Sequence, residues 1–216
     1  MKTVKNKRII LGIDPGSMIT GFGIIELNNG KFSLVKCDAI VNNSKTDLPI
    51  RLGVIFQTLD SVIKKYKPDE IAIETAFYGK NAQSALKLGQ ARGVAMLSAV
   101  INKIALSEYS PREVKKAVVG NGAASKEQVQ YMVKSILKLH PDKVGTKYYD
   151  ITDALAVAIC HSFRSVNSLI IPKKQFQQNS RRYKDWKAFV IDNNKSIKPK
   201  SYVIISNRKI NLQNSN

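Results

Sequence analysis

Residues 8–30, RIILGIDPGSMITGFGIIELNNG, carry the strongest fold signal in the sequence. The first part, residues 8–13, is a nearly continuous apolar run, which is typical of a strand buried on both faces. Pro15-Gly16 then predicts a turn, so Asp14 stands at the very end of that strand. The chain is therefore expected to begin with a buried strand that carries a carboxylate at its C-terminal end.

The rest of the first 163 residues alternates between strand and helix patterns. Asn28-Asn29-Gly30 separates two strand-like runs, 21–27 and 31–40, and predicts a hairpin. Further on, the pattern predicts an amphipathic helix at 48–66, a strand at 70–74, a helix at 81–102, a strand at 104–109, two helices with capping boxes at Ser110 and Ser125, and a last helix at 150–163. This order indicates an α/β fold in which a mixed five-stranded sheet has helices on both faces.

The composition indicates a polyanionic partner. The chain has 35 Lys and Arg against 16 Asp and Glu, a formal net charge of +19, and 44% hydrophobic residues, enough for a core. Cys37 and Cys160 are the only cysteines, which excludes a disulfide framework and a cysteine-based zinc site. The N-terminus lacks the pattern of a secretory signal, and no apolar run reaches the roughly 18 residues that a membrane span needs. We therefore expect a cytoplasmic protein that contacts nucleic acid and no membrane.

The basic excess divides the chain at about residue 163. Residues 1–163 hold 23 basic and 14 acidic side chains, whereas residues 164–216 hold 12 basic and 2 acidic ones. The second segment is also rich in Asn, Ser, Gln and Lys, and its basic patch includes Arg181 and Arg182. We interpret 1–163 as a folded domain and 164–216 as a largely flexible basic extension with DNA contacts in this patch. Contact with a branch-migration partner and packing on the domain through Trp186 and residues 202–205 are alternative interpretations of this extension.

Four acidic residues stand where ionised carboxylates are costly. Asp14 and Glu74 each end an apolar strand, and Asp150 and Asp153 lie one turn apart at the start of a helix rich in small apolar residues. Hard oxygen ligands suit Mg²⁺ or Mn²⁺, and paired divalent ions catalyse phosphodiester cleavage. The pattern predicts a metal site of that kind. Asp before Pro-Gly is also an ordinary turn former, and Asp at a helix start an ordinary cap, so both interpretations are open from these residues alone.

Four longer motifs follow one another along the chain: LGIDPGSMITGFG at 11–23, IAIETAFYGKNAQSALKLGQARG at 71–93, SPREVKKAVVGNGAASKEQVQ at 110–130 and YYDITDALAVAICH at 148–161. Together they resemble the RuvC family of bacterial Holliday junction resolvases, in register over about residues 7–163. The resemblance implies an RNase H-like fold, a homodimer, and paired symmetric nicks in four-way junction DNA during recombination and repair. It also implies two divalent ions per active site, Mg²⁺ with Mn²⁺ as a substitute, and the RuvA/RuvB branch-migration complex as a partner.

The resemblance also assigns roles by position. Asp14, Glu74, Asp150 and Asp153 match the catalytic, metal-binding acids, and Phe77 matches an aromatic residue that enters the junction centre. The expected DNA contacts in the domain are Phe77, Lys80, Lys115 and Lys126. Met18 stands where some members have a basic residue, so no phosphate contact is inherited there, and nothing is inherited for the extension after Arg164.

The two histidines and two glycines within a predicted helix are expected to have structural roles. His140 precedes Pro141 and His161 ends the final helix, so both are expected to be structural rather than metal ligands. Gly89 and Gly93 lie within a predicted helix and are expected to allow close helix packing, for example at a subunit interface.

Three other functions share part of this sequence pattern. A sugar-kinase or actin-like ATPase has a similar first loop, but the sequence shows neither a second phosphate loop nor a Gly-rich adenosine site. A non-catalytic junction-binding protein would be favoured by loss of an acid, yet all four are present. Another RNase H-like nuclease, acting on RNA–DNA hybrids or transposon ends, is disfavoured by the matches at Phe77, Lys115 and Lys126.

Overall fold

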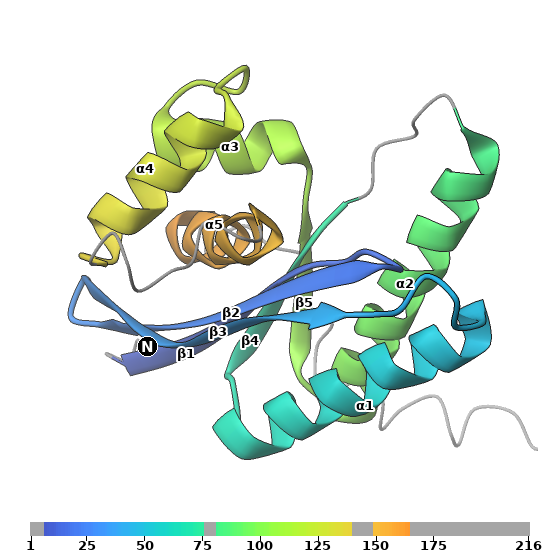
Figure 1. The fold of residues 1–216 in the computed structure, drawn as a ribbon. Helices are drawn as coiled ribbons and strands as arrows, with labels where there is room; N and C mark the ends of the chain where they lie inside the picture. The colour runs from blue at the N-terminus through green and yellow to red at the C-terminus, as the bar shows by residue number, and fades with distance from the viewer. Residues whose placement is uncertain (1–6, 76–80, 140–148, 165–216) are drawn as a thin grey trace, which may run out of the picture. The chain divides into compact units, whose positions relative to one another are not determined.

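The computed structural model describes residues 7–75, 81–139 and 149–164 (Figure 1). Its elements are β1 (Lys7–Asp14), β2 (Ile19–Asn28), β3 (Lys31–Val41), α1 (Leu48–Tyr66), β4 (Glu70–Glu74), α2 (Ala82–Ile101), β5 (Ala105–Tyr109), α3 (Pro111–Val119), α4 (Lys126–Ile136) and α5 (Tyr149–Arg164). The sheet order is β3-β2-β1-β4-β5. The first three strands are antiparallel, and β4 and β5 are added in parallel, which confirms the predicted mixed five-stranded sheet.

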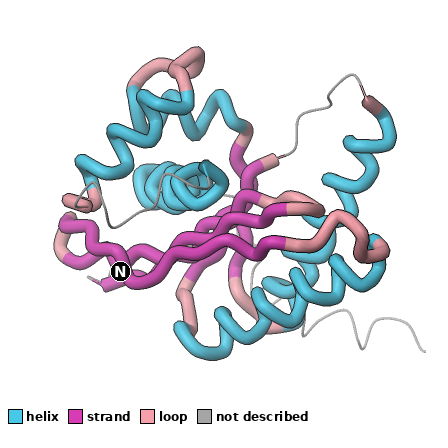
Figure 2. The backbone as a smooth tube through the Cα atoms, in the orientation of Figure 1, coloured by secondary structure: helices cyan, strands magenta, loops and turns pink. Residues whose placement is uncertain are grey.

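Helices cover both faces of the sheet, as predicted (Figure 2). On one face, α1 and α2 pack on the sheet around Leu11, Ile13 and Ile73. On the other face, α5 lies on β1 and β2, and α3 and α4 pack over α5. Apolar residues on both faces of β1 explain why its sequence is a continuous apolar run rather than an alternating one.

Helix α5 lies unusually close to the strands beneath it. Nearly every side chain from Thr152 to His161 is buried, as expected for a helix enclosed on all sides. Gly12 of β1 and Gly21 of β2 make this approach possible: a Cβ at Gly12 would overlap the carbonyl oxygen of Ala154, and one at Gly21 would overlap that of Asp150. The glycines of the opening motif therefore set the depth at which α5 sits on the sheet.

The C-terminal end of α5 is tied to β4 and β5. The buried His161 hydrogen-bonds through Nδ1 to the Tyr109 hydroxyl, at 2.9 Å, and through Nε2 to the Glu70 carboxylate. The hydrogen bond from His161, together with the charge and hydrogen bond of Arg8, keeps the pKa of Glu70 below its usual value, although burial acts to raise it. His161 is thus structural, as predicted, whereas His140 lies outside the described residues.

The predicted elements differ from the observed ones only at their ends. Both capping boxes form, at Ser110 before α3 and at Ser125 before α4. Asn81 is the N-cap of α2 rather than its first residue, and its side chain accepts a hydrogen bond from the Ser84 backbone. Lys103 adopts a positive φ of 57° between α2 and β5, so the helix ends earlier and the strand begins later than the sequence suggested.

Candidate active site

The fold brings the four acids to one edge of the sheet. The parallel register of β1 and β4 pairs Ile13 with Ile73, so Asp14 and Glu74 come next to each other at adjacent strand ends. Gly21 pairs with Asp14 across β1 and β2, and its missing side chain leaves room for the backbone at Asp150. Elements that are distant in sequence thus place carboxylates of two strands and one helix together.

The electrostatics of these acids differ from those of ordinary surface carboxylates. Burial, followed by the charges of Glu74, Asp153 and Asp150, raises the pKa of Asp14 well above its usual value. Burial and the charge of Asp153 raise the pKa of Glu74 to about 7. Asp14 and Glu74 are therefore coupled, and the negative charge of Glu74 makes it harder for Asp14 to carry one of its own. Full ionisation of all four carboxylates is unfavourable unless a bound cation offsets their negative charge.

The donor set fits a hard divalent ion. All four donors are carboxylates, which suit Mg²⁺ or Mn²⁺ rather than the nitrogen and sulfur ligands typical of zinc. Within the described residues, no three acidic, His or Cys side chains converge closely enough to form a ready metal cage. The carboxylates would therefore have to close around a cation, and each ligand would have to be ionised when the cation is bound.

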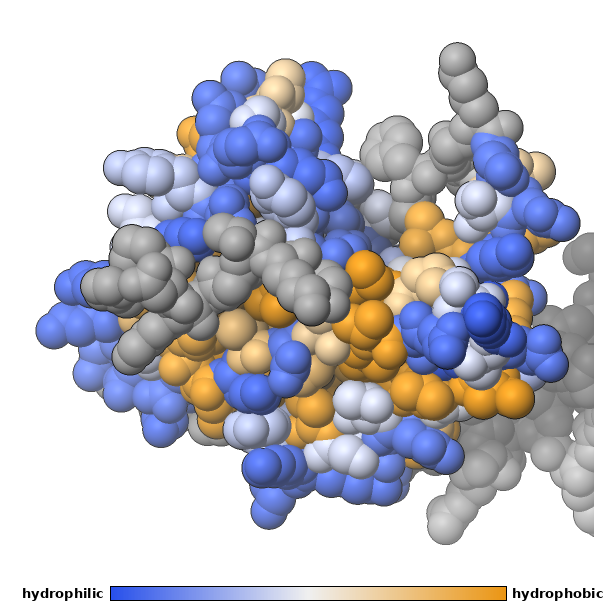
Figure 3. All heavy atoms as spheres, viewed as in Figure 1, coloured by the Kyte–Doolittle hydropathy of each residue, from blue (hydrophilic) through white to orange (hydrophobic). Residues whose placement is uncertain are grey.

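Two lysines face the acids from the layer of α3 and α4. Lys126, the first residue of α4, places Nζ 3.3 Å from Asp153 Oδ2 and 5.9 Å from the centre of the Tyr149 ring. Burial acts to lower the pKa of Lys126, but the charges of Asp153, Asp14 and Asp150 raise it above its usual value. The charge of Lys115 on α3 counters the raised pKa values of Glu74 and Asp153, which places it near them. Figure 3 shows hydrophilic residues over the outer surface of α3 and α4.

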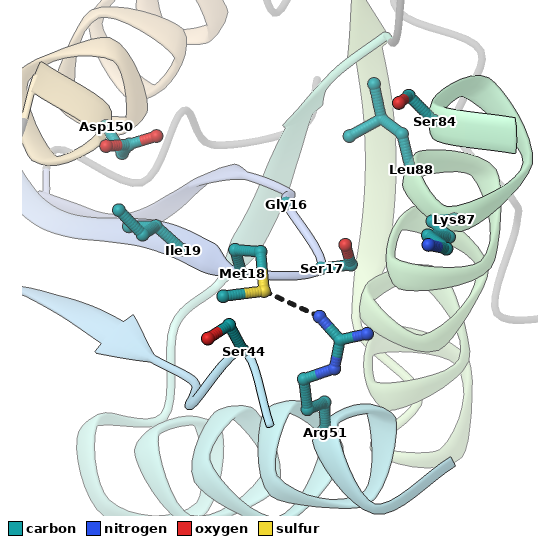
Figure 4. Close-up of a pocket in the computed structure, with 10 residues that line it drawn as sticks. All are labelled: Gly16, Ser17, Met18, Ile19, Ser44, Arg51, Ser84, Lys87, Leu88 and Asp150. Carbon is teal, nitrogen blue, oxygen red and sulfur yellow. Dashed lines mark hydrogen bonds between the residues drawn. The ribbon is translucent and has the colours of Figure 1, made fainter. Parts of the chain in front are cut away.

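Sequence reasoning missed one residue beside this cluster. Arg51 of α1 lines a pocket that also includes Met18 and Asp150 (Figure 4). An available signal was its register, because Arg51 occupies the same helical face as Ile55, Leu59 and Ile63, where an apolar residue is expected. Its guanidinium lies against the Met18 thioether. Arg51 therefore places a basic group next to position 18, where some family members have a basic residue and this chain has Met18.

The remaining predicted contacts are not placed by the structure. Phe77, Lys80, Arg181 and Arg182 lie outside the described residues. Their assignment to DNA binding stays a prediction, as do the roles of the four acids and of Lys115 and Lys126. The boundary at residue 163 also stays a prediction.

The sheet order, the helices on both faces and the acids on β1, β4 and α5 define an RNase H-like nuclease. The chain belongs to the RuvC family: the family profile described as "Crossover junction endodeoxyribonuclease RuvC" matches residues 10–161. Members of this family are metal-dependent nucleases.

Individual relatives give the same result. The chain is 45% identical over 185 residues to the RuvC of Chloroherpeton thalassium, covering 86% of this chain and 96% of that one. It is 43% identical over 195 residues to the RuvC of Christiangramia forsetii, covering 90% of this chain and 95% of that one. The solved structure of Thermus thermophilus RuvC in complex with Holliday junction substrate is 28% identical, with a TM-score of 0.69, and covers 76% of this chain and 99% of that one.

The longer matches bear on the basic extension. A match of 185 or 195 residues cannot fit within residues 1–163, so these relatives share part of the sequence beyond Arg164. The extension therefore has counterparts within the family. Separately, no helix among the described residues is both long and apolar enough to cross a membrane.

Proposed function

We propose that this protein resolves four-way DNA junctions in the cytoplasm by paired, symmetric, metal-dependent nicks. The observation that carries the proposal is the meeting of Asp14, Glu74, Asp150 and Asp153 at one edge of the sheet, in a chain of the RuvC family. A basic protein that gathers buried carboxylates beside basic side chains can hold cations and receive a phosphodiester in the same place.

Each residue has a distinct task in the proposed reaction. The proposed cofactor is two Mg²⁺ or Mn²⁺ ions, which when bound would supply an activated water and stabilise the leaving 3′-oxygen. Asp14, at the end of the strand between β2 and β4, would be the central ligand of this site. Glu74 and the Asp150/Asp153 pair complete the ligand set. Lys126 and Lys115 orient the scissile phosphate and offset its charge, and Phe77 stacks on an unpaired base at the crossover.

The direct test is cleavage of a synthetic mobile four-way junction with Mg²⁺, beside linear duplex and RNA–DNA hybrid. We expect paired nicks in the junction alone. Preferential cleavage of the hybrid would instead indicate a different RNase H-like nuclease, and junction binding without nicks in any metal would indicate a non-catalytic binding protein.

The proposed homodimer would use the outer face of α2. Leu86, Leu97 and Ile101 are 69%, 50% and 53% exposed, and Gly93 lies on the same stripe. A Cβ at Gly93 would meet nothing within 4 Å, so the close packing expected of this glycine is not made within the described residues. Paired nicks need two active sites, and the described residues of one chain supply a single set of acids. A second copy of this chain is therefore the occupant that fits the stripe.

Replacing Leu97 with Glu is expected to convert the dimer into a folded monomer. The new charge would lie in the apolar contact, while the exposed position leaves the core untouched. Sedimentation velocity should show the change in mass, and cleavage of a supercoiled cruciform should change from linear products to single nicks. Val54→Glu on α1, which is 40% exposed, is the matched control and should stay dimeric. A dimeric Leu97→Glu protein would place the interface elsewhere.

We also propose that the basic extension binds junction arms, with Arg181 and Arg182 among its contacts, and that the RuvA/RuvB complex is a partner. Truncation after Ser165 is expected to leave an active enzyme with weaker and less salt-sensitive DNA binding. Because the slope of affinity against salt counts neutralised phosphates at about 0.9 each, it should fall by about two or three units. Equal slopes for the two proteins would exclude a DNA-binding extension.

A further inference from the structure

A pocket of about 610 Å³ lies beside the acid cluster (Figure 4). Its wall combines the turn after β1, the start of α1 and the start of α2. Asp150 forms part of the wall, so the pocket opens directly next to the proposed metal site. Its volume lies within the range of ligand-binding pockets and exceeds what a single phosphate group needs.

The pocket contains a buried cation without an ionic partner. Arg51 is 8% exposed, and its Nε has no hydrogen-bond partner among the described residues. Its Nη1 is directed at the Met18 thioether, which is a weak acceptor. Among the described residues, no carboxylate forms an ion pair with Arg51. A guanidinium in this position is costly unless an anion binds to it.

The rest of the wall suits an anion with further polar atoms. Figure 4 shows Ser17 and Lys87 across the pocket from Arg51, with Ser84 nearer the start of α2 and Ser44 beside the Met18 side chain. Helices α1 and α2 both begin at this pocket, and neither has an acidic residue in its first turn, although Asp47 is the N-cap of α1. Two cationic side chains, two helix starts and several hydroxyl groups therefore surround the space, and Asp150 is the acidic residue in its lining.

We propose that this pocket binds a backbone phosphate of the DNA strand next to the scissile phosphodiester, with Arg51 as its principal contact and Lys87 as the second. The identity of the ligand rests on the proposed junction nuclease function. The anion-binding character of the pocket rests only on Arg51 and its surroundings. Phosphate chemistry is shared by a DNA strand and by free phosphate, and the experiment separates these two sources.

The decisive variant is Arg51→Met, which removes the charge and keeps most of the volume. Without DNA, it should unfold at the same or a higher temperature, because an unpaired buried charge is gone. With a four-way junction and EDTA in place of metal, we expect about tenfold weaker binding, as for loss of a hydrogen bond to a charged group. The salt slope should fall by about 0.9, the value for one phosphate. Unchanged affinity and slope would overturn the proposal.

Three further variants keep the result interpretable. Lys65→Met, an exposed lysine in the last turn of α1, is the matched control and should leave affinity and unfolding unchanged. If Arg51→Met does not fold, Arg51→Lys and the exposed Lys87→Met test the same site, and both should weaken binding by several fold. If Arg51→Lys and Lys87→Met both bind the junction as tightly as the wild type, the proposal is also overturned.

A second arm uses inorganic phosphate at constant ionic strength, read by thermal unfolding. Stabilisation of the wild type but not of Arg51→Met, with equal DNA slopes, would mean that the pocket takes free phosphate and would overturn the DNA assignment. Loss of both responses supports the proposal. If the wild type shows no preference for junctions over linear duplex, the proposed function fails. The difference in salt slope between the wild type and Arg51→Met, measured on linear duplex, would still test whether the pocket binds a DNA phosphate.

Discussion

Replacing Asp14 with Asn is expected to reduce junction cleavage by about a hundredfold or more while junction binding persists. Asp14 is the acid most surrounded by other acids, and metal ions held there supply several kcal/mol of transition-state stabilisation. Asn keeps the shape and removes the charge, so DNA affinity should stay equal or increase. Single-turnover cleavage and gel-shift titration of the same junction would measure the two effects.

The same variant makes a prediction about stability. Burial and the neighbouring carboxylates disfavour ionised Asp14, so the metal-free Asn variant should unfold at a higher temperature than the wild type. Mg²⁺ should stabilise the wild type and have little effect on the variant. Asp38→Asn is the matched control, because exposed Asp38 pairs with Lys36 on β3, two strands across from Asp14, and should leave cleavage unchanged. A folded Asp14→Asn protein that cuts at a normal rate would exclude Asp14 as a central ligand.

Gly21→Ala is expected to lower cleavage by about a hundredfold without touching a catalytic side chain. Its Cβ would overlap the Asp150 carbonyl oxygen, so the start of α5 would have to move away from β1. Overpacking of this kind costs about 1–3 kcal/mol in stability, and a misplacement of about 1 Å in an active site costs about a hundredfold in rate. Denaturant unfolding and cleavage of one preparation would report both.

Gly53→Ala on α1 provides the matched comparison. A Cβ there meets nothing within 4 Å, and Ala is favoured over Gly inside a helix by about 0.5–1 kcal/mol. The control should therefore be slightly more stable and fully active. Normal activity of Gly21→Ala would show that α5 can shift without disturbing the acids.

Much of the fold could be predicted because its signals are local. The apolar run before Asp14, the Asn28-Asn29-Gly30 turn and the capping boxes at Ser110 and Ser125 each depend on a few consecutive residues, and the structure confirms all of them. The ends of α2 and β5 were less accurate, because the positive φ of Lys103 has no distinct sequence signal.

The site could be predicted only in part. The four acids stand out because a carboxylate at the end of an apolar strand or helix is unusual, but the closeness of Asp14 to Glu74 depends on strand register across residues that are 60 positions apart. Arg51 was missed because a single basic residue in an amphipathic helix resembles a surface residue until its burial is known. The role of Phe77 rests on family resemblance alone.

The position of α5 also has a consequence for the order in which the domain folds during synthesis. The strands it covers are made first, as residues 7–28, whereas α5 is Tyr149–Arg164, the last described element. During synthesis, the glycine-lined face of β1 and β2 stays uncovered until nearly the whole domain has been translated. Half of the acids, Asp150 and Asp153, arrive with the helix that closes this face. Completion of the core and assembly of the acids are therefore one event, and a chain that stops before residue 149 contains only two of the four carboxylates.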